Sequence, residues 1–449
     1  MRTPVFNPIW SGSVWLAGAV LTLALAVFNL AHAQASSEVT TENRIPADLG
    51  ALTLQRAEQL MLARNHDVQR ARRAVEAAEA GVTSAGARPN PNLTLGVGSV
   101  NPSLGAGGGN LRDKTVDSSL RLDQVLERGD KRELRVAGAK SQEAAAGGDY
   151  QDAVRQALLA LRQAYYDLLL AQDRLAIAND TLGLFDRSLD AADKRYRAGD
   201  IAASDVSRLR VDALRAANDA RSAEADLRRA RGALALLMDV DAADAIKAVS
   251  PWPDARDLPT DVDTEQVIGA RADVRAAQAR VEAASSARDL ARAQRTRDVS
   301  VGVQYDHFPA SAANPTGTGN TFGVSVSVPL FVNYGFEGEI RRAESDYGAA
   351  MDALARTRAQ ARSELQRARS DLRAAADRLQ RYDTSLLVEA RRSAESAEFA
   401  YRNGAIGVMD LLDARRTLRS IENDAAQAHG DFAKALAAWE AGRAAAPAQ

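Results

Sequence analysis

The chain has 449 residues and a formal net charge of -2, so its overall charge gives no reason to expect nucleic-acid binding. It contains no cysteine, which excludes disulfides, thiolate metal sites, cysteine nucleophiles and a lipid anchor attached through cysteine. Its 4 histidines lack metal-ligand spacing, and no nucleophile motif or phosphate-binding loop is present. We therefore predict no catalytic residues, no cofactor and no metal site.

The amino-terminal segment is typical of an export signal. Arg2 supplies a positive charge, residues 14–30 are apolar, and the small-x-small sequence at 31–33 is a cleavage site. We predict a signal peptide over 1–33, with an uncleaved membrane anchor as the alternative, and a polar, irregular segment over 34–51. No later segment approaches the ~18 uninterrupted apolar residues of a spanning helix, so we expect an exported protein without transmembrane helices.

The first half of the remaining chain predicts a β-hairpin between long helices. Leu93, Leu95 and Val97 alternate with small or polar residues, which indicates a strand with one apolar face. In chain order we expect a helix over 53–86 broken near Asn65, a hairpin over 92–126 with a glycine-rich loop, a helix from Lys131 to Ala198 of about 100 Å, a returning helix over about 203–238 and an irregular connector over 239–264.

The long helix carries an apolar residue every seven positions. This row consists of Val154, Leu161, Leu168, Leu175, Leu182, Leu189 and Tyr196. A sustained heptad row is typical of a coiled-coil seam. The alternative is the buried face of an ordinary helical bundle, which requires no particular function.

The second half repeats the first. Asp67-Val68 matches Asp273-Val274 at an offset of 206 residues, and similar matches continue through both hairpins. The second hairpin is expected over 299–331, with strand residues from Val299 to Tyr305 and from Phe322 to Leu330. A second long helix is expected over 337–400, with Leu365, Leu372, Leu379 and Leu386 in a heptad row. We therefore predict two repeats, 52–238 and 265–440, followed by a disordered tail at 441–449.

One motif occurs in both repeats, at 196–205 (YRAGDIAASD) and at 401–410 (YRNGAIGVMD). Gly199 and Gly404 follow the motif tyrosines by three residues, and glycine is a common helix stop because it adopts the left-handed conformation easily. The aspartate that ends each motif suits the first turn of a following helix, where the helix dipole favours an anion. Each copy therefore predicts a tight turn between two long helices.

Strands of this kind in an exported protein indicate an outer-membrane barrel. They are about 9–11 residues long, alternate apolar with small or polar residues and are joined by long loops. A soluble hairpin with one solvated face is the alternative. Four strands cannot close a barrel, and an open sheet edge in lipid leaves backbone groups unpaired. We therefore expect the chain to oligomerise, with three copies supplying twelve strands.

These features resemble the TolC-like outer membrane factor family, the exit ducts of tripartite efflux and type I secretion systems. The resemblance rests on the paired Y-R-x-G-x-I-x-x-x-D motifs, ARPNPNLTLGV at 87–97, VSVPLF at 326–331 and LERGDKRELRVAGAK at 126–140. It implies a mainly α fold with a small β part: a homotrimer with an α-helical periplasmic tunnel and a twelve-stranded transmembrane barrel in outer-membrane lipid. It also implies two partners, a periplasmic adaptor and an inner-membrane pump.

The resemblance also implies roles for the turn residues. Asp410 and Asp413 match acidic residues whose rings narrow the tunnel entrance; the alternatives are a helix cap and a solvated charge. Asp205 and Tyr401, with Tyr196, match contacts that hold the entrance shut, although Ile406 replaces an arginine that takes part in the best-known pattern. Gly199 and Gly404 would lie where the adaptor docks, or would be simple helix stops.

We therefore expect a passive outer-membrane exit duct fed by an inner-membrane pump, of the RND type by the family resemblance. The LERGDKR segment resembles the heavy-metal branch of the family, which would make metal cations a cargo. The competing prediction is a periplasmic coiled-coil adaptor or interaction protein, whereas no residues support an enzyme.

Overall fold

The computed structural model describes residues 49–99, 116–255, 263–310, 315–317 and 319–443. The chain divides into residues 1–46 and a compact unit of residues 47–449, and the second unit contains both repeats. The predicted signal peptide, the segment 34–48, nearly all of the glycine-rich loop and most of the tail lie outside the described residues.

The first repeat begins with two helices, α2 (Leu54–Arg64) and α3 (His66–Gly86). The predicted break at Asn65 is confirmed, and its cause is a helix cap. Oδ1 of Asn65 accepts hydrogen bonds from the N–H groups of Asp67 (3.0 Å) and Val68 (3.2 Å), which α3 cannot satisfy internally. The Asn65 side chain also donates to the Leu237 carbonyl, so this cap ties α3 to a helix far along the chain.

The long helix of the first repeat is confirmed. α4 (Lys131–Arg197) has 67 residues, which corresponds to about 100 Å, and α5 (Ala203–Met238) returns beside it. Leu161 and Leu168 of the heptad row are fully buried in the main core. The connector packs against this core and contains η3 (Ala243–Ala245). Ala248 of the connector forms a parallel β-bridge with Leu52, which follows η1 (Leu49–Ala51).

The second repeat contains α6 (Thr264–Ala270), α7 (Ala272–Ala293), α8 (Glu337–Arg381), α9 (Leu387–Arg402) and α10 (Val408–Arg443). The single helix predicted over 337–400 is interrupted by η4 (Tyr382–Leu386), a π-helical turn.

This π turn ends the heptad row of the second repeat. Leu365, Leu372 and Leu379 are buried as predicted, but Leu386 is 44% exposed. A π turn inserts one residue into the helical period and rotates the following side chains onto a different face. Within the single chain the buried part of the row therefore ends at Leu379.

The four strands form one antiparallel sheet, in the order β1 (Asn92–Gly98), β2 (Asp117–Leu126), β3 (Val299–Phe308) and β4 (Gly319–Ser327). The two predicted hairpins are joined by pairing between β2 and β3. Val328 and Leu330 lie beyond the end of β4, where Pro329 has no N–H to continue the ladder. Within this sheet β1 and β4 are edge strands.

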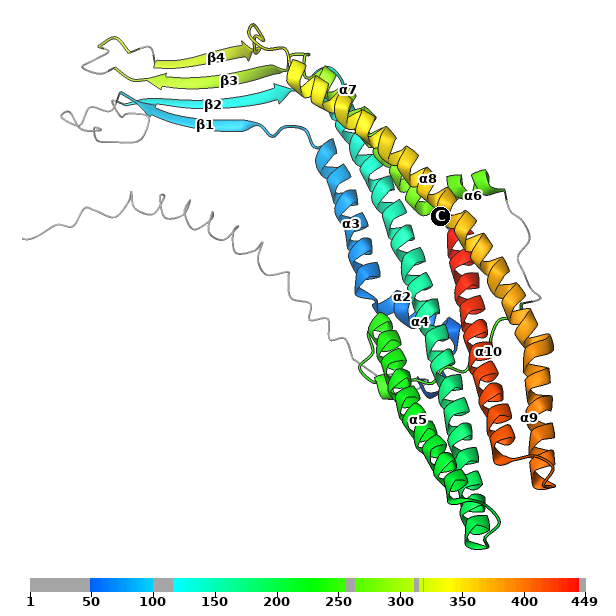
Figure 1. Cartoon of the computed structure of the whole chain (residues 1–449). Helices are drawn as coiled ribbons and strands as arrows, with labels where there is room; N and C mark the ends of the chain where they lie inside the picture. The colour runs from blue at the N-terminus through cyan, green and yellow to red at the C-terminus, as the bar shows by residue number, and fades with distance from the viewer. Residues whose placement is uncertain (1–48, 100–115, 256–262, 311–314, 318, 444–449) are drawn as a thin grey trace, which may run out of the picture. The chain divides into compact units, whose positions relative to one another are not determined.

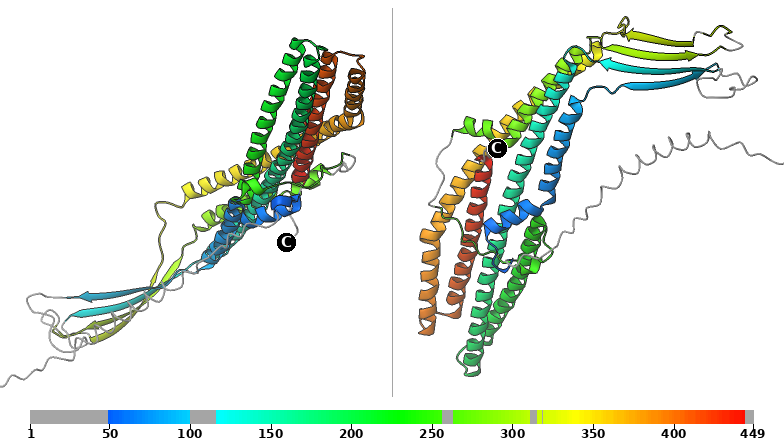
Figure 2. Two further views of the ribbon diagram at one scale, coloured as in Figure 1. Left: turned by 90° about the horizontal axis from the view of Figure 1, so that it is seen from below. Right: turned by 180° about the vertical axis from the view of Figure 1, so that it is seen from behind.

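The sheet and the two turns lie at opposite ends of the helices in the unit 47–449 (Figures 1 and 2). α4 runs the whole way from the end of β2 to the first turn, and it contacts α3, α5, α7 and α10. The helices and the sheet therefore present two separate regions to consider as functional sites.

Candidate functional site

The two motif turns have the same backbone conformation. Gly199 (φ +84°) and Gly404 (φ +71°) are left-handed, a conformation that costs other residues roughly 1–2 kcal/mol. In each turn the glycine N–H bonds to the motif tyrosine carbonyl at 3.0 Å. The next N–H bonds to the carbonyl five residues earlier, at 2.9 Å and 2.8 Å. This is the Schellman ending of a helix, so the predicted helix stop is confirmed.

Asp205, Asp410 and Asp413 lie on the helices that leave these turns. Asp205 lies in the first turn of α5, and Asp410 in the first turn of α10, where its Oδ2 accepts from the Gly407 N–H at 3.3 Å. Asp413 is 71% exposed and lies 3.4 Å from Arg416. Within one chain, Asp410 is thus a helix cap and Asp413 a solvated charge, and both are on the surface.

The two turns contact each other through a pair that the sequence did not indicate. Nη1 of Arg195 donates to the Tyr401 hydroxyl at 3.1 Å, and its guanidinium lies 5.6 Å from the centre of the Tyr401 ring. Among the described residues the Tyr401 hydroxyl has no bond to Asp205, its predicted partner, and Tyr196 is 48% exposed. Arg195 lies just before the repeated motif, so the motif comparison passed over it.

Ion pairs join the two returning helices above the turns. The carboxylate of Asp212 in α5 is only 6% exposed and accepts from Arg416 of α10 at 2.6 Å. Asp219 and Arg419 form a second pair at 2.5 Å, further along both helices. Nearby on α10, burial raises the pKa of Glu422, which Arg391 partly opposes. These pairs hold the two repeats together close to the turns.

The sheet has one apolar face. In an antiparallel sheet, residues in register share a face, so the pairing assigns every side chain. The apolar face contains Leu93, Leu95, Val97, Leu120, Leu122, Val301, Val303, Tyr305, Phe322, Val324 and Val326. Phe322 is 81% exposed and Val324 77%, although such side chains are normally buried. Within one chain this face is therefore not covered by protein.

The opposite face of the sheet is polar and internally bonded. Arg121 donates to Asp123 of its own strand at 2.7 Å and to Ser325 of β4 at 3.2 Å, across the intervening strand β3. At that crossing β3 has Gly302, where an added Cβ would overlap both Asp123 and Ser325. The glycine leaves room for this network. The two faces follow the predicted period of two through the middle of the sheet, while Ser118, Gln124, His307 and Asn320 put polar side chains on the apolar face.

Neither a metal centre nor a membrane-spanning helix is found in the described part of the chain. It contains no group of three or more His, Asp or Glu side chains that could hold a metal ion. No described helix is both long and apolar enough to cross a membrane.

Comparison with known proteins assigns the chain to a family. The sequence model of outer membrane efflux proteins matches residues 58–239 and 264–441, which is most of both repeats. The chain belongs to the outer membrane efflux protein family. The unmatched interval between the two segments is the connector. The members of this family are channels, so this protein is not an enzyme.

Solved structures of membrane proteins share this fold. A membrane protein from Pseudomonas aeruginosa is 20% identical, with a TM-score of 0.74 over 87% of this chain and 90% of that one. VceC from Vibrio cholerae is also 20% identical, with a TM-score of 0.71 over 87% and 96%. CmeC, an outer membrane channel of Campylobacter jejuni, is 16% identical, with a TM-score of 0.72 over 88% and 87%.

A search of curated protein sequences found no match. For this outer membrane efflux protein the comparisons therefore give the family and the fold, and the mainly helical architecture with a small sheet is confirmed.

Proposed function

We propose that this protein is the outer-membrane exit duct of a tripartite efflux system, and that substrates from an inner-membrane pump pass through it passively. The sheet carries this proposal. It combines an exposed apolar face, a bonded polar face and two unpaired edges in a member of the outer membrane efflux protein family. An apolar outer face and a polar inner face are what a strand needs between lipid and an aqueous channel.

The working form that we propose is a homotrimer in the outer membrane. Unpaired edge strands in lipid cost several kcal/mol per backbone group, so β1 of one copy must pair with β4 of the next. Three copies then close a barrel of twelve strands, and their helices form a periplasmic tunnel. The family assignment favours this duct over the alternative of a coiled-coil adaptor. A cleaved signal peptide at 1–33 would deliver the chain.

We propose that the tunnel is gated at the turns. Asp410 and Asp413 of three copies would place six carboxylates around the entrance, which would attract cations. Tyr401, Asp205 and Tyr196 would make the contacts that hold the entrance closed. In the single chain Tyr196 is exposed and Asp205 and Tyr401 are half-buried, so all three retain surface that a neighbouring copy can contact. Arg195 adds a contact to Tyr401 that partly replaces the arginine missing at Ile406.

The partners that we propose are a periplasmic adaptor and an inner-membrane pump of the RND type. The left-handed Gly199 and Gly404 expose the backbone at the turns, where no side chain blocks an approaching adaptor hairpin. Metal cations are the cargo suggested by the LERGDKR segment, and the support for that cargo is this resemblance alone.

Planar-bilayer recording of the purified trimer tests the constriction. Removing both charges with Asp410→Ala and Asp413→Ala should reduce block of the pore current by multivalent cations. The control pair Asp186→Ala and Asp190→Ala removes the same charge from the surface of α4 and should leave block unchanged.

Two different failures can be separated in this experiment. A protein that stays soluble and monomeric, without outer-membrane fractionation, would overturn the duct itself. Conducting trimers whose block is insensitive to the Asp410 and Asp413 changes would overturn only the constriction.

A further inference from the structure

The two hairpins of the sheet have the same internal register. Leu95 pairs with Leu120 in the first hairpin, and Val301 pairs with Val326 in the second. Both residues of the second pair lie 206 positions after their counterparts in the first. Every pair from Thr94 to Gly98 in the first ladder has such a counterpart in the second ladder. Residues 206 positions apart therefore have equivalent places in the two hairpins.

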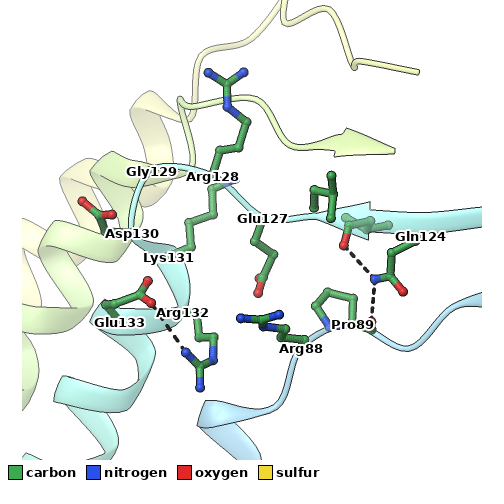
Figure 3. A pocket seen from close by; sticks show the side chains of 12 residues that line it. Arg88, Pro89, Gln124, Glu127, Arg128, Gly129, Asp130, Lys131, Arg132 and Glu133 are labelled. Carbon is green, nitrogen blue, oxygen red and sulfur yellow. Dashed lines mark hydrogen bonds and ion pairs between the residues drawn. The ribbon is translucent and has the colours of Figure 1, made fainter. Parts of the chain in front are cut away.

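The seam between the two repeats is the pairing of β2 with β3. On the apolar face, the three pairs nearest the helices are Leu122–Val303, Gln124–Val301 and Leu126–Val299. At this end of β2 the Gln124 side chain donates to the Pro89 carbonyl at 2.9 Å, which ties the strand to the segment before β1 (Figure 3). In a ring of identical copies, the neighbour's β1 lies beside β4 as β3 lies beside β2.

The seam between two copies therefore has a predictable register. At the offset of 206, the counterparts of the three pairs above are Val328–Val97, Leu330–Leu95 and Val332–Leu93, where the second residue belongs to the neighbouring copy. All six side chains are apolar and exposed in the single chain; Leu330 is 71% and Leu95 73% exposed. A long apolar sheet edge of this kind is normally paired or covered.

In the single chain β4 is shorter than its counterpart β2. β4 ends at Ser327, whereas β2 runs to Leu126, the counterpart of Val332. Pro329 lacks an N–H, but a strand residue directs its N–H to one neighbouring strand only. The ladder with β3 stops just before Pro329, as expected if the missing N–H faces β3. The other edge of the segment then keeps its donors, apart from the Val332 N–H, which binds the Leu330 carbonyl at 3.1 Å.

The turn end of the helices shows the same relation between the repeats. Nη1 of Arg415 in α10 donates to Oγ of Ser188 in α4 at 2.6 Å, across the two repeats. In this region the repeat offset is 205, so the counterparts are Arg210 and Ser393, which are both exposed. Arg415 and Arg210 also each pair with an acidic residue of their own hairpin, at 3.7 Å and 3.5 Å. Arg210 is thus placed to reach a neighbour's Ser393 as Arg415 reaches Ser188.

We propose that the seam between two copies repeats the seam between the two repeats of one chain. β4 then continues to Val332, opens the turn between Leu330 and Val332, and pairs with the neighbour's β1 so that Leu330 lies opposite Leu95. At the other end of the same two copies, Arg210 donates to Ser393. This register rests on the proposed trimer, and it specifies which residues of β1 and β4 meet, which twelve strands alone do not.

Disulfide cross-linking tests the register, and the absence of cysteine from the natural chain removes any background. After oxidation of Leu95→Cys, Leu330→Cys in membranes, we expect most chains to run as covalent trimers on a denaturing gel and as monomers after reduction. Residues directly opposite each other have Cα atoms about 5.5 Å apart or less, within reach of a disulfide. Within one chain β1 and β4 are separated by two strands, or about 14 Å, so only a bond between copies can form.

The matched controls move one cysteine by two residues along β1. Leu93→Cys, Leu330→Cys and Val97→Cys, Leu330→Cys place the thiols on diagonals with Cα atoms about 7–8 Å apart, beyond the usual disulfide range. We expect these variants to remain largely monomeric on the same gel. At the turn end, Arg210→Cys with Ser393→Cys should join copies through a short bifunctional maleimide.

The outcomes separate the register from the duct. A shifted pair that cross-links as well as Leu95→Cys, Leu330→Cys would overturn the register. Native mass spectrometry of the unoxidised variants shows whether they form trimers; if that variant does not, Val97→Cys, Val328→Cys is the second pair in register. Trimers in which neither in-register pair cross-links would also overturn the register and leave the duct standing. Absence of trimers in the unaltered protein would overturn the duct itself.

Discussion

At the scale of single residues, the most buried charge in the described part of the chain is Arg271. Its side chain is 1% exposed and binds Asp273 at 2.7 Å and Glu364 at 3.0 Å, while its Nη1 has no partner. Burial alone would lower the pKa of Arg271, but its hydrogen bonds to the two carboxylates outweigh burial and raise it. Arg271 corresponds to Asn65 of the first repeat, so one repeat orders this helix junction with a cap and the other with an ion-pair network.

We expect Arg271→Ala to lower the free energy of unfolding by about 3–5 kcal/mol, because Asp273 loses its hydrogen-bonded cation in a poorly hydrated site. Arg271→Met should cost less, since it refills the volume. Thermal loss of the helical circular dichroism signal measures both. The exposed-site control Arg187→Ala should change the midpoint little, and an equally small change for Arg271→Ala would contradict the role assigned to the network.

The same network predicts a dependence on pH. Burial raises the pKa of Asp273. The hydrogen bond and the charge of Arg271 lower this pKa by more than burial raises it, so it lies below its usual value. The carboxylate therefore stabilises the fold above the unfolded pKa of about 3.9. That stability is lost as the pH falls through the lower, folded pKa. In melting curves recorded from pH 7 to about pH 3, Asp273→Asn should lose less stability than the unaltered protein; equal losses would be evidence against the pair.

At the scale of elements, α4 and α7 approach closely at one glycine. A Cβ added to Gly148 would lie 2.8 Å from the Ala276 Cβ and 3.0 Å from the Ala272 carbonyl oxygen. At the neighbouring Gly147 nothing lies within 4 Å of the added atom. Both glycines lie within α4 and have the same helical backbone conformation. A substitution at Gly147 therefore measures helix propensity alone, whereas the same substitution at Gly148 also measures packing against α7.

We expect Gly148→Ala to destabilise the fold by about 1–3 kcal/mol, because α7 must move away. Gly147→Ala should stabilise it by about 0.5–1 kcal/mol, because alanine is the better helix former. Chemical denaturation of the two variants side by side measures the difference. The same sign of change for both would mean that α4 and α7 do not pack at Gly148.

The spacing of apolar residues predicted a helix or strand well where that spacing stayed constant along the whole element. The alternation around Leu95 and Val324 defined both the strands and their apolar face, and Gly199 marked the helix end. The π turn was not predicted, because the leucines keep their seven-residue spacing in the sequence up to Leu386. The turn changes only the side of the helix on which the residues after it lie. The contact between Arg195 and Tyr401 was also missed, since it joins residues 206 positions apart and no local pattern reports it.

At the scale of the whole molecule, the two faces of the sheet should tolerate charge very differently. Val303 and Gln304 are neighbours in β3 and lie on the apolar and polar faces respectively. In the proposed duct Val303→Arg places a charge in lipid at a cost of about 2–4 kcal/mol, whereas Gln304→Arg faces water. We expect Val303→Arg to reduce the yield of membrane-inserted trimers strongly and Gln304→Arg to leave it nearly unchanged. Similar yields would mean that the apolar face does not contact lipid.

The unpaired edges β1 and β4 have a genetic consequence. In the proposed trimer every copy supplies one edge to each neighbour, so a single damaged copy opens the ring at that seam. If a cell makes equal amounts of intact and edge-damaged chains that mix freely, only about one trimer in eight contains intact chains alone. A proline in β4 should therefore be dominant over the unaltered gene, whereas a null allele should be recessive.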